Sequence, residues 1–215
     1  MNDTSESKRT YRAPRRTAAA ARTRLAVVVA ATSEFERRGW AGTTLRAVAE
    51  AAGVSVKTVE ALHGTKGALL KTVVEFSIRG DLDPSPISER DVIARIEAAE
   101  DAGEMLELHA AHIRTVQQRS ARVAWAVEHA AASDAAAADL WRTMNANRRF
   151  GIRWAAGTLL GKPGRDESLT PAEVETMFWV AFDWGTYRTL TTHAGLTPDE
   201  FQRWLGDYYR RVFLP

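Results

Sequence analysis

Apolar residues recur every three or four positions from about Arg16 onward, which is the spacing of one face of an α-helix. The first of these series is Leu25, Val28, Val29, Thr32 and Phe35. Gly39 follows it, and a glycine at this point is typical of a helix end. Residues 1–15 are polar and basic without an apolar repeat, so we predict a disordered tail there.

Three shorter segments repeat this pattern. Thr43 or Thr44 can cap a helix that Gly53 ends, Ser55 can cap a helix of about two turns, and Thr65 can cap a fourth. Their apolar faces are Leu45, Val48, Ala49 and Ala52; Val54, Val59 and Leu62; and Leu69, Leu70, Val73 and Phe76.

A loop is predicted at residues 79–88, which contain one glycine and two prolines. The chain beyond it is alanine-rich with helical periodicity. Ser133-Asp134 suits the start of a long helix toward Leu160, and Thr170 and Thr197 each begin a capping-box pattern. The segment from Pro171 to His193 reads as one helix that is apolar on more than one face. No β-alternating run of useful length occurs.

We therefore predict an all-α protein with an N-terminal three-helix helix-turn-helix domain and a larger helical domain. The expected divisions are a tail at 1–15, the small domain at 16–64, a connecting helix at 65–79 and the larger domain at 80–215. A helix, a turn with Gly53 and a short capped helix within residues 43–66 are the elements of a helix-turn-helix. The second helix of that motif enters the major groove of DNA.

Charge is divided unevenly over the 215 residues. Residues 1–66 hold 12 Lys/Arg and 6 Asp/Glu, whereas residues 67–215 hold 17 and 21. A basic N-terminal part favours a polyanion partner, although a basic tail that only aids solubility remains open.

Other functional classes find little support. Cysteine is absent, which excludes disulfides, thiolate metal sites and a cysteine nucleophile. We find no common catalytic or nucleotide-binding motif, and His109 and His112 have no second Glu-x-x-His motif to complete a bundle metal site. We expect no enzyme, no cofactor and no metal. Without a signal peptide or a long apolar run, we expect a cytoplasmic protein with no membrane partner.

Residues 23–70 resemble the N-terminal domain of the tetracycline-repressor (TetR) family of bacterial transcriptional regulators. The matching features are ordered along the chain: Phe35, Arg38-Gly39-Trp40, Thr43-Thr44, Val48-Ala49, Ala52 to Ser55, Thr58-Val59, Gly64 to Lys66 and Leu69-Leu70. The resemblance implies DNA contacts from Thr44, Arg46, Ser55, Val56, Lys57, Thr58 and Lys66, the last one to a phosphate.

Two residues depart from the family pattern. Glu60 stands where the family usually has a tyrosine, and His63 where an aromatic residue follows it. Glu60 could accept from cytosine N4, or it could pair with Lys57, and we favour the ion pair. His63 is expected to be partly buried with one nitrogen hydrogen-bonded. Whether Arg12, Arg15 and Arg16 reach a minor groove stays open.

The resemblance also implies a ligand cavity and a dimer face in the second domain. By residue type and helical face, the candidates for ligand contacts are His109, His112, Trp125, Trp141, Met144, Phe178 and Trp179. The segment from Pro171 and the last helix would form the dimer face, with Ala181 and Gly185 allowing close helix approach. The alternative is that these residues only fill the subunit's own core.

The leading hypothesis is a homodimeric repressor that reads a pseudo-palindromic double-stranded DNA operator and is released by a small apolar or aromatic effector. The alternative is a helical small-molecule-binding protein whose helix-turn-helix is vestigial. A test of DNA binding distinguishes these two hypotheses.

Overall fold

The structure, a computed structural model, describes the backbone of residues 5–215 and side chains from residue 18 onward. Helices joined by short turns make up this part of the chain, and it contains no strand, which confirms the all-α prediction. The chain divides into two compact units, Met1–Val73 and Val74–Pro215. The division falls inside helix α4 (Lys66–Arg79), the segment expected to connect the domains.

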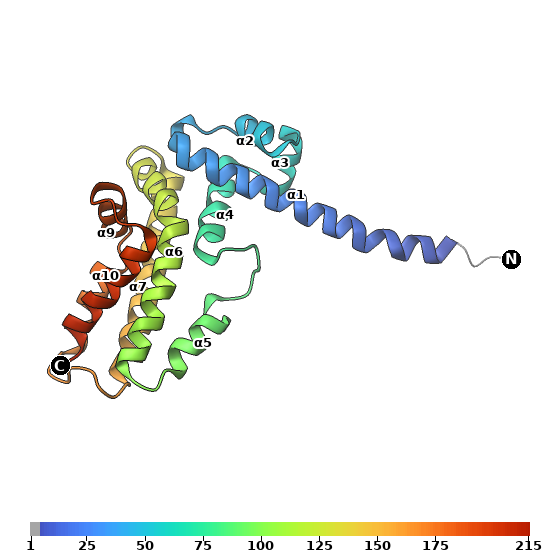
Figure 1. Ribbon diagram of the computed structural model, residues 1–215. Coiled ribbons are helices and arrows are strands. Elements are labelled where there is room, and N and C mark those ends of the chain that lie inside the picture. The colour runs from blue at the N-terminus through green and yellow to red at the C-terminus, as the bar shows by residue number, and fades with distance from the viewer. Residues whose placement is uncertain (1–4) are drawn as a thin grey trace. The chain divides into compact units, whose positions relative to one another are not determined.

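The first unit contains α1 (Ser5–Gly42), α2 (Leu45–Ala52), α3 (Val56–His63) and the start of α4. The prediction of a disordered tail is wrong for residues 5–15, which belong to α1, while residues 1–4 lie outside the described part. An apolar face indicates that a helix packs against other elements. A segment rich in Lys, Arg and Ala, which favour helices, can be helical without such a face. In Figure 1 this part of α1 extends beyond α2 and α3.

The core of the first unit differs slightly from the predicted face of α1. Leu25 and Val29 are exposed, at 43% and 50%, whereas Val28 and Phe35 are fully buried. Val27 and Ala31 complete the buried face instead. The apolar spacing identified the helix, but only packing against α2 selects which of two adjacent faces is covered.

The connector between α1 and α2 is held by polar contacts. Gly39 has a φ of 65°, a left-handed conformation that favours glycine, and it interrupts α1 where the sequence predicted an end. The buried Thr43 hydroxyl donates to the carbonyl oxygens of Glu34 and Gly39 at 3.0 and 2.8 Å. Thr44, the other candidate, is the residue that caps α2.

The second unit is built around one long helix, α6 (Ala102–Ala131), which packs against α5 (Asp91–Ala98), α7 (Ala135–Leu160) and α10 (Pro198–Phe213) (Figure 1). The 3₁₀ turn η1 (Ile87–Glu89) precedes α5. Asp134 caps α7, and capping boxes begin α8 (Pro171–Ala181) at Thr170 and α10 at Thr197, as predicted.

The predicted helix from Pro171 to His193 is wrong, because the chain breaks after Ala181. Asp183 is extended, with φ −79° and ψ 126°, and caps the short α9 (Trp184–Arg188), which continues into the π turn η2 (Thr189–His193). Residues distant in the sequence hold the chain at this break. Gln117 Nε2 donates to the Phe182 carbonyl at 2.9 Å, and Arg148 forms an ion pair with Asp183 at 3.1 Å. Ala181 and Gly185 therefore do not share one helix.

No helix within residues 5–215 is both long enough and apolar enough to cross a membrane.

Candidate nucleic-acid interface and ligand cavity

Hydroxyl caps fix the two helices of the predicted helix-turn-helix. Thr44 Oγ1 accepts from the Ala47 amide at 3.1 Å, and Ser55 Oγ accepts from the Thr58 amide at 3.1 Å. Gly53, with a φ of 66°, makes the turn between α2 and α3. Each cap satisfies a backbone donor that a helix start leaves free, so both helices begin at defined positions.

The buried face of the motif leaves the predicted DNA-binding residues on the other side. Val48, Ala49, Val59 and His63 are buried. Thr44, Arg46, Ser55 and Lys57 are exposed, while Val56 and Thr58 are partly covered.

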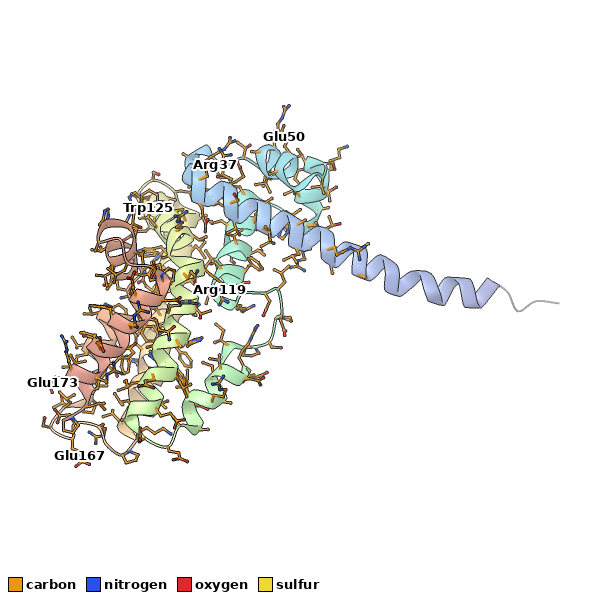
Figure 2. All side chains as sticks on the ribbon, viewed as in Figure 1. Arg37, Glu50, Arg119, Trp125, Glu167 and Glu173 are labelled. Carbon is orange, nitrogen blue, oxygen red and sulfur yellow. The ribbon has the colours of Figure 1, made fainter. Side chains whose placement is uncertain are left out.

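Two of these exposed residues already have partners within the motif. The Ser55 and Thr58 hydroxyls lie 2.9 Å apart, and Arg46 Nε pairs with Glu50 Oε1 at 3.1 Å. Figure 2 marks Glu50 on α2. Since the Arg46–Glu50 pair is solvent-exposed, it costs little to open when an anion competes for the arginine.

Lys66 lies in a different setting from the one that the resemblance implies. It is partly covered, its Nζ donates to the Trp40 carbonyl, and it lies 4.2 Å from the centroid of the Trp40 ring. An ammonium over an indole face is attracted by the ring quadrupole. Lys66 therefore ties the start of α4 to the connector after α1, and its phosphate contact stays a prediction.

Glu60 is exposed on α3 and forms no ion pair with any described residue, so the favoured pair with Lys57 is not formed. His63 is buried more completely than predicted, and its Nε2 has no hydrogen-bond partner in the described part of the chain. Burial, aided by the Arg24 charge, lowers the pKa of His63. The side chains of Arg12, Arg15 and Arg16 lie outside the described side chains.

The second unit contains a cavity of about 800 Å³. That volume lies in the range of small-molecule sites. Its wall comes from the end of α4, the segment around η1, α5, α6, α7 and the break between α8 and α9. The apolar part of the wall includes Ile78, Val92, Leu108, Val116, Met144, Phe150, Trp154, Phe182 and Trp184.

Of the seven predicted ligand residues, only His112 and Met144 line this cavity. His109 and Phe178 are fully buried in the core, where the Tyr209 hydroxyl lies 2.9 Å from His109 Nδ1. The other three, Trp125, Trp141 and Trp179, pack on His129, Trp184 and Arg148 respectively. Residue type and helical spacing therefore did not identify which aromatic side chains line the cavity.

Sequence reasoning missed the arginines of the cavity wall, namely Arg79, Arg90, Arg95, Arg119 and Arg148. The signal available was Arg119, a charged residue seven positions after His112 on the same face of α6. Two glutamates, Glu75 and Glu97, are the acidic residues of the wall. The ionisable groups of the wall are thus mainly cations.

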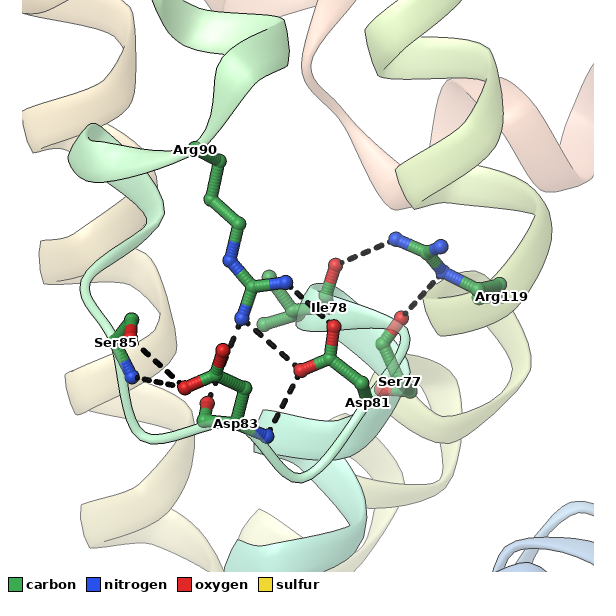
Figure 3. Close-up of polar contacts among 7 residues, drawn as sticks. All are labelled: Ser77, Ile78, Asp81, Asp83, Ser85, Arg90 and Arg119. Atoms are coloured by element: carbon green, nitrogen blue, oxygen red, sulfur yellow. Dashed lines mark hydrogen bonds and ion pairs between the residues drawn. The ribbon is translucent and has the colours of Figure 1, made fainter.

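A polar cluster stands beside the cavity at the end of α4 (Figure 3). Arg90 binds the Asp81 carboxylate through two nitrogens, at 2.5 and 3.0 Å, which lowers the pKa of Asp81 to about 2. Arg119 donates to the carbonyl oxygens of Ser77 at 3.2 Å and Ile78 at 2.8 Å. Arg119 thereby satisfies carbonyl groups that the end of a helix leaves without partners.

His112 is a neutral group at physiological pH. Burial, with a smaller effect of the Arg119 charge, lowers its pKa to about 4. It can therefore offer the cavity one N–H donor and one acceptor, but no charge. The described residues contain no group of three or more acidic, histidine or cysteine side chains that could hold a metal ion.

Comparison with known families identifies one match. Residues 27–73 match the family described as bacterial regulatory proteins, tetR family. The matched segment runs from the buried face of α1 through α2 and α3 into α4. Among curated protein sequences, none matches the chain.

Solved structures resemble the chain over most of its length. A TetR transcription regulator from Haloarcula marismortui aligns with a TM-score of 0.61 and 14% identity, covering 89% of this chain and 98% of that one. A transcriptional regulator from Rhodococcus sp. Rha1 aligns at 0.59 and 18%, covering 88% and 95%. A Saccharomonospora viridis protein in complex with choline aligns at 0.66 and 16%, covering 89% and 97%. At these identities the likeness concerns the fold.

Proposed function

We propose that this chain is a cytoplasmic, homodimeric transcriptional repressor of the tetR family, because residues 27–73 match that family of bacterial regulatory proteins. The observation that carries the proposal is the doubly capped pair α2 and α3, whose exposed side presents Thr44, Arg46, Ser55 and Lys57. In a two-fold dimer, two copies of α3 about 34–36 Å apart would read successive major grooves of a pseudo-palindromic operator.

The cavity of the second unit supports control by a small effector. Its volume and its largely apolar wall suit a compact organic ligand, and the Saccharomonospora viridis protein of the same fold was solved with choline. A ligand that prefers a conformer with wrongly spaced α3 helices would release the DNA. The residues proposed to contact DNA are Thr44, Arg46, Ser55, Val56, Lys57, Thr58 and Lys66.

A gel-shift titration against the DNA flanking its own gene tests the repressor proposal. Lys57→Ala should weaken the complex and reduce the slope of log K against log[salt] by about one, because one phosphate contact is lost. Lys71→Ala, an equally exposed lysine on α4, is the matched control and should leave the slope unchanged.

Absence of a specific complex at moderate salt would refute the repressor proposal. An unchanged salt slope for Lys57→Ala, together with tight binding of small molecules, would favour the alternative of a ligand-binding protein with a vestigial helix-turn-helix.

A further inference from the structure

Arg119 is a cation of the cavity wall that has no carboxylate partner. It lies just past the middle of α6 (Figure 2), and no acidic group of the described chain lies within the 4.0 Å of an ion pair. Its hydrogen bonds go to two backbone carbonyls, which use two of the five N–H donors of a guanidinium. Its Nη1 donates to none of the described residues.

The neighbouring charges do not neutralise Arg119. Asp81 acts on it electrostatically, but the carboxylate of Asp81 is held by Arg90 (Figure 3). Arg148, another partly covered arginine of the wall, has Asp183 as its partner at 3.1 Å. Burial lowers the pKa of Arg119, which means that its charged form is poorly solvated where it lies. An anion bound beside it would offset that cost.

A large part of the wall beyond Arg119 is apolar, and it reaches the protein surface. Leu108, Val116, Met144, Phe150, Trp154 and Phe182 surround the space beyond Arg119. Phe150 is 74% exposed, so the cavity is open to solvent beside it. A ligand that fits both parts of the wall has one charged end and an apolar remainder.

We propose that the cavity binds an amphipathic carboxylate, with its head group on Arg119 and its apolar tail against α6 and α7. The inference deepens the proposed function and rests on it for the ligand's role as effector. It also suggests how binding is transmitted: a carboxylate is a stronger acceptor than a carbonyl, so it competes for the guanidinium that bonds the last turn of α4.

Ligand binding to the purified full chain, without DNA, tests the head group. The probes are octanoate, octanol and octyltrimethylammonium, together with naphthoate and naphthalenemethanol, measured by tryptophan fluorescence and calorimetry near neutral pH. The carboxylate of at least one pair should bind about 10- to 100-fold more tightly than its alcohol, the range expected for hydrogen bonds to a charged group. The ammonium should bind most weakly.

Two variants on α6 assign the preference to one residue. Arg119→Gln should bring the carboxylate to the affinity of the alcohol and leave alcohol binding unchanged, which also shows that the cavity remains intact. Arg122→Gln is the matched control, since Arg122 is exposed three positions further along the same helix and does not line the cavity. It should keep the full preference.

The proposal is overturned if neither carboxylate binds, if both bind no better than their alcohols, if the ammonium binds most tightly, or if Arg119→Gln keeps the preference. If Arg119→Gln does not fold, Arg119→Lys and the probe series on the wild-type chain still test whether the cavity prefers a carboxylate. These measurements do not use DNA. They can therefore be interpreted even if the chain does not bind its operator. If the wild type does bind its operator, the carboxylate should weaken that complex and Arg119→Gln should abolish this effect.

Discussion

Two lysines predicted to meet DNA have different surroundings. Lys57 is exposed at the start of α3 and forms no ion pair within the described chain, whereas Lys66 contacts the carbonyl and the ring of Trp40. Replacing Lys66 removes an internal hydrogen bond and a cation–π contact, worth roughly 1–2 kcal/mol together. If Lys66→Ala lost DNA binding, the loss could come from reduced stability or from a lost DNA contact. Lys57 has no such internal contacts within the described chain, so Lys57→Ala is the better test of the interface.

His112 makes stability depend on pH. Its pKa is about 4 in the folded chain and 6.5 when unfolded, so the unfolded state takes up a proton first as the pH falls. The free energy of unfolding should decrease from about pH 6.5 downward, by about 3 kcal/mol at most for this residue. Urea titrations at several pH values measure it.

His112→Gln provides the control for that titration. Between pH 6.5 and 4.5 it should lose about 2–3 kcal/mol less stability than the wild type, because glutamine does not titrate. An equal loss in both proteins would show that His112 does not cause it. Burial also lowers the pKa of His109, and the His112 charge lowers it further, so His112→Gln removes that smaller contribution as well.

At the scale of elements, the break between α8 and α9 depends on Asp183. Its carboxylate accepts from the Thr186 amide at 2.8 Å as the cap of α9 and pairs with Arg148, whose side chain is only 7% exposed. Asp183→Ala would therefore remove a cap and leave a buried guanidinium without its counter-charge. We expect a loss of about 2–4 kcal/mol in the free energy of unfolding, measured by urea denaturation.

Asp134→Ala is the matched control, because Asp134 caps α7 by the same kind of bond, at 2.9 Å, without an ion pair. It should cost about 1 kcal/mol. Adding Arg148→Met to Asp183→Ala should recover part of the larger loss. Equal losses for Asp183→Ala and Asp134→Ala would show that the ion pair contributes nothing.

These elements also separate what sequence patterns can predict from what they cannot. Caps at Ser55, Asp134 and Thr170 were predictable because each depends on a bond to a residue three positions away. The break at Phe182 and Asp183 was not predictable, because it is bonded by Gln117, 65 positions before Phe182, and by Arg148, 35 positions before Asp183.

The cavity wall was equally hard to predict, since it depends on how each helix is rotated within the bundle. His112 and His109 lie three positions apart on α6, yet one lines the cavity and the other is in the core.

At the scale of the whole molecule, both compact units are needed for the proposed regulation. The unit that ends at Val73 carries the predicted DNA contacts, and the unit from Val74 carries the cavity. Only α4 belongs to both, since the division falls between its residues Val73 and Val74. The end of α4, whose carbonyl groups accept hydrogen bonds from Arg119, is therefore the part of the shared helix that lines the cavity.

Dimer formation is the prediction at this scale. Val180 on α8 is 47% exposed and half-buried Trp204 and Tyr208 stack on α10, so these helices present apolar surface that a partner subunit would cover. Size-exclusion chromatography with light scattering should give about twice the chain mass of 23.7 kDa. A mass of one chain at micromolar concentration would contradict the dimer.

Gly80 is a position where one substitution would disturb the contact between Arg119 and the end of α4. Its φ is 89°, and a Cβ added there would lie 2.3 Å from Arg119 Nη1. Any other side chain would strain the backbone and push the guanidinium away from the end of α4. Under the proposed function, a substitution at position 80 would therefore alter effector sensitivity by moving Arg119, without replacing any residue of the cavity wall or of α3. For the same reason, position 80 is a practical site for tuning the threshold of a biosensor built on this chain.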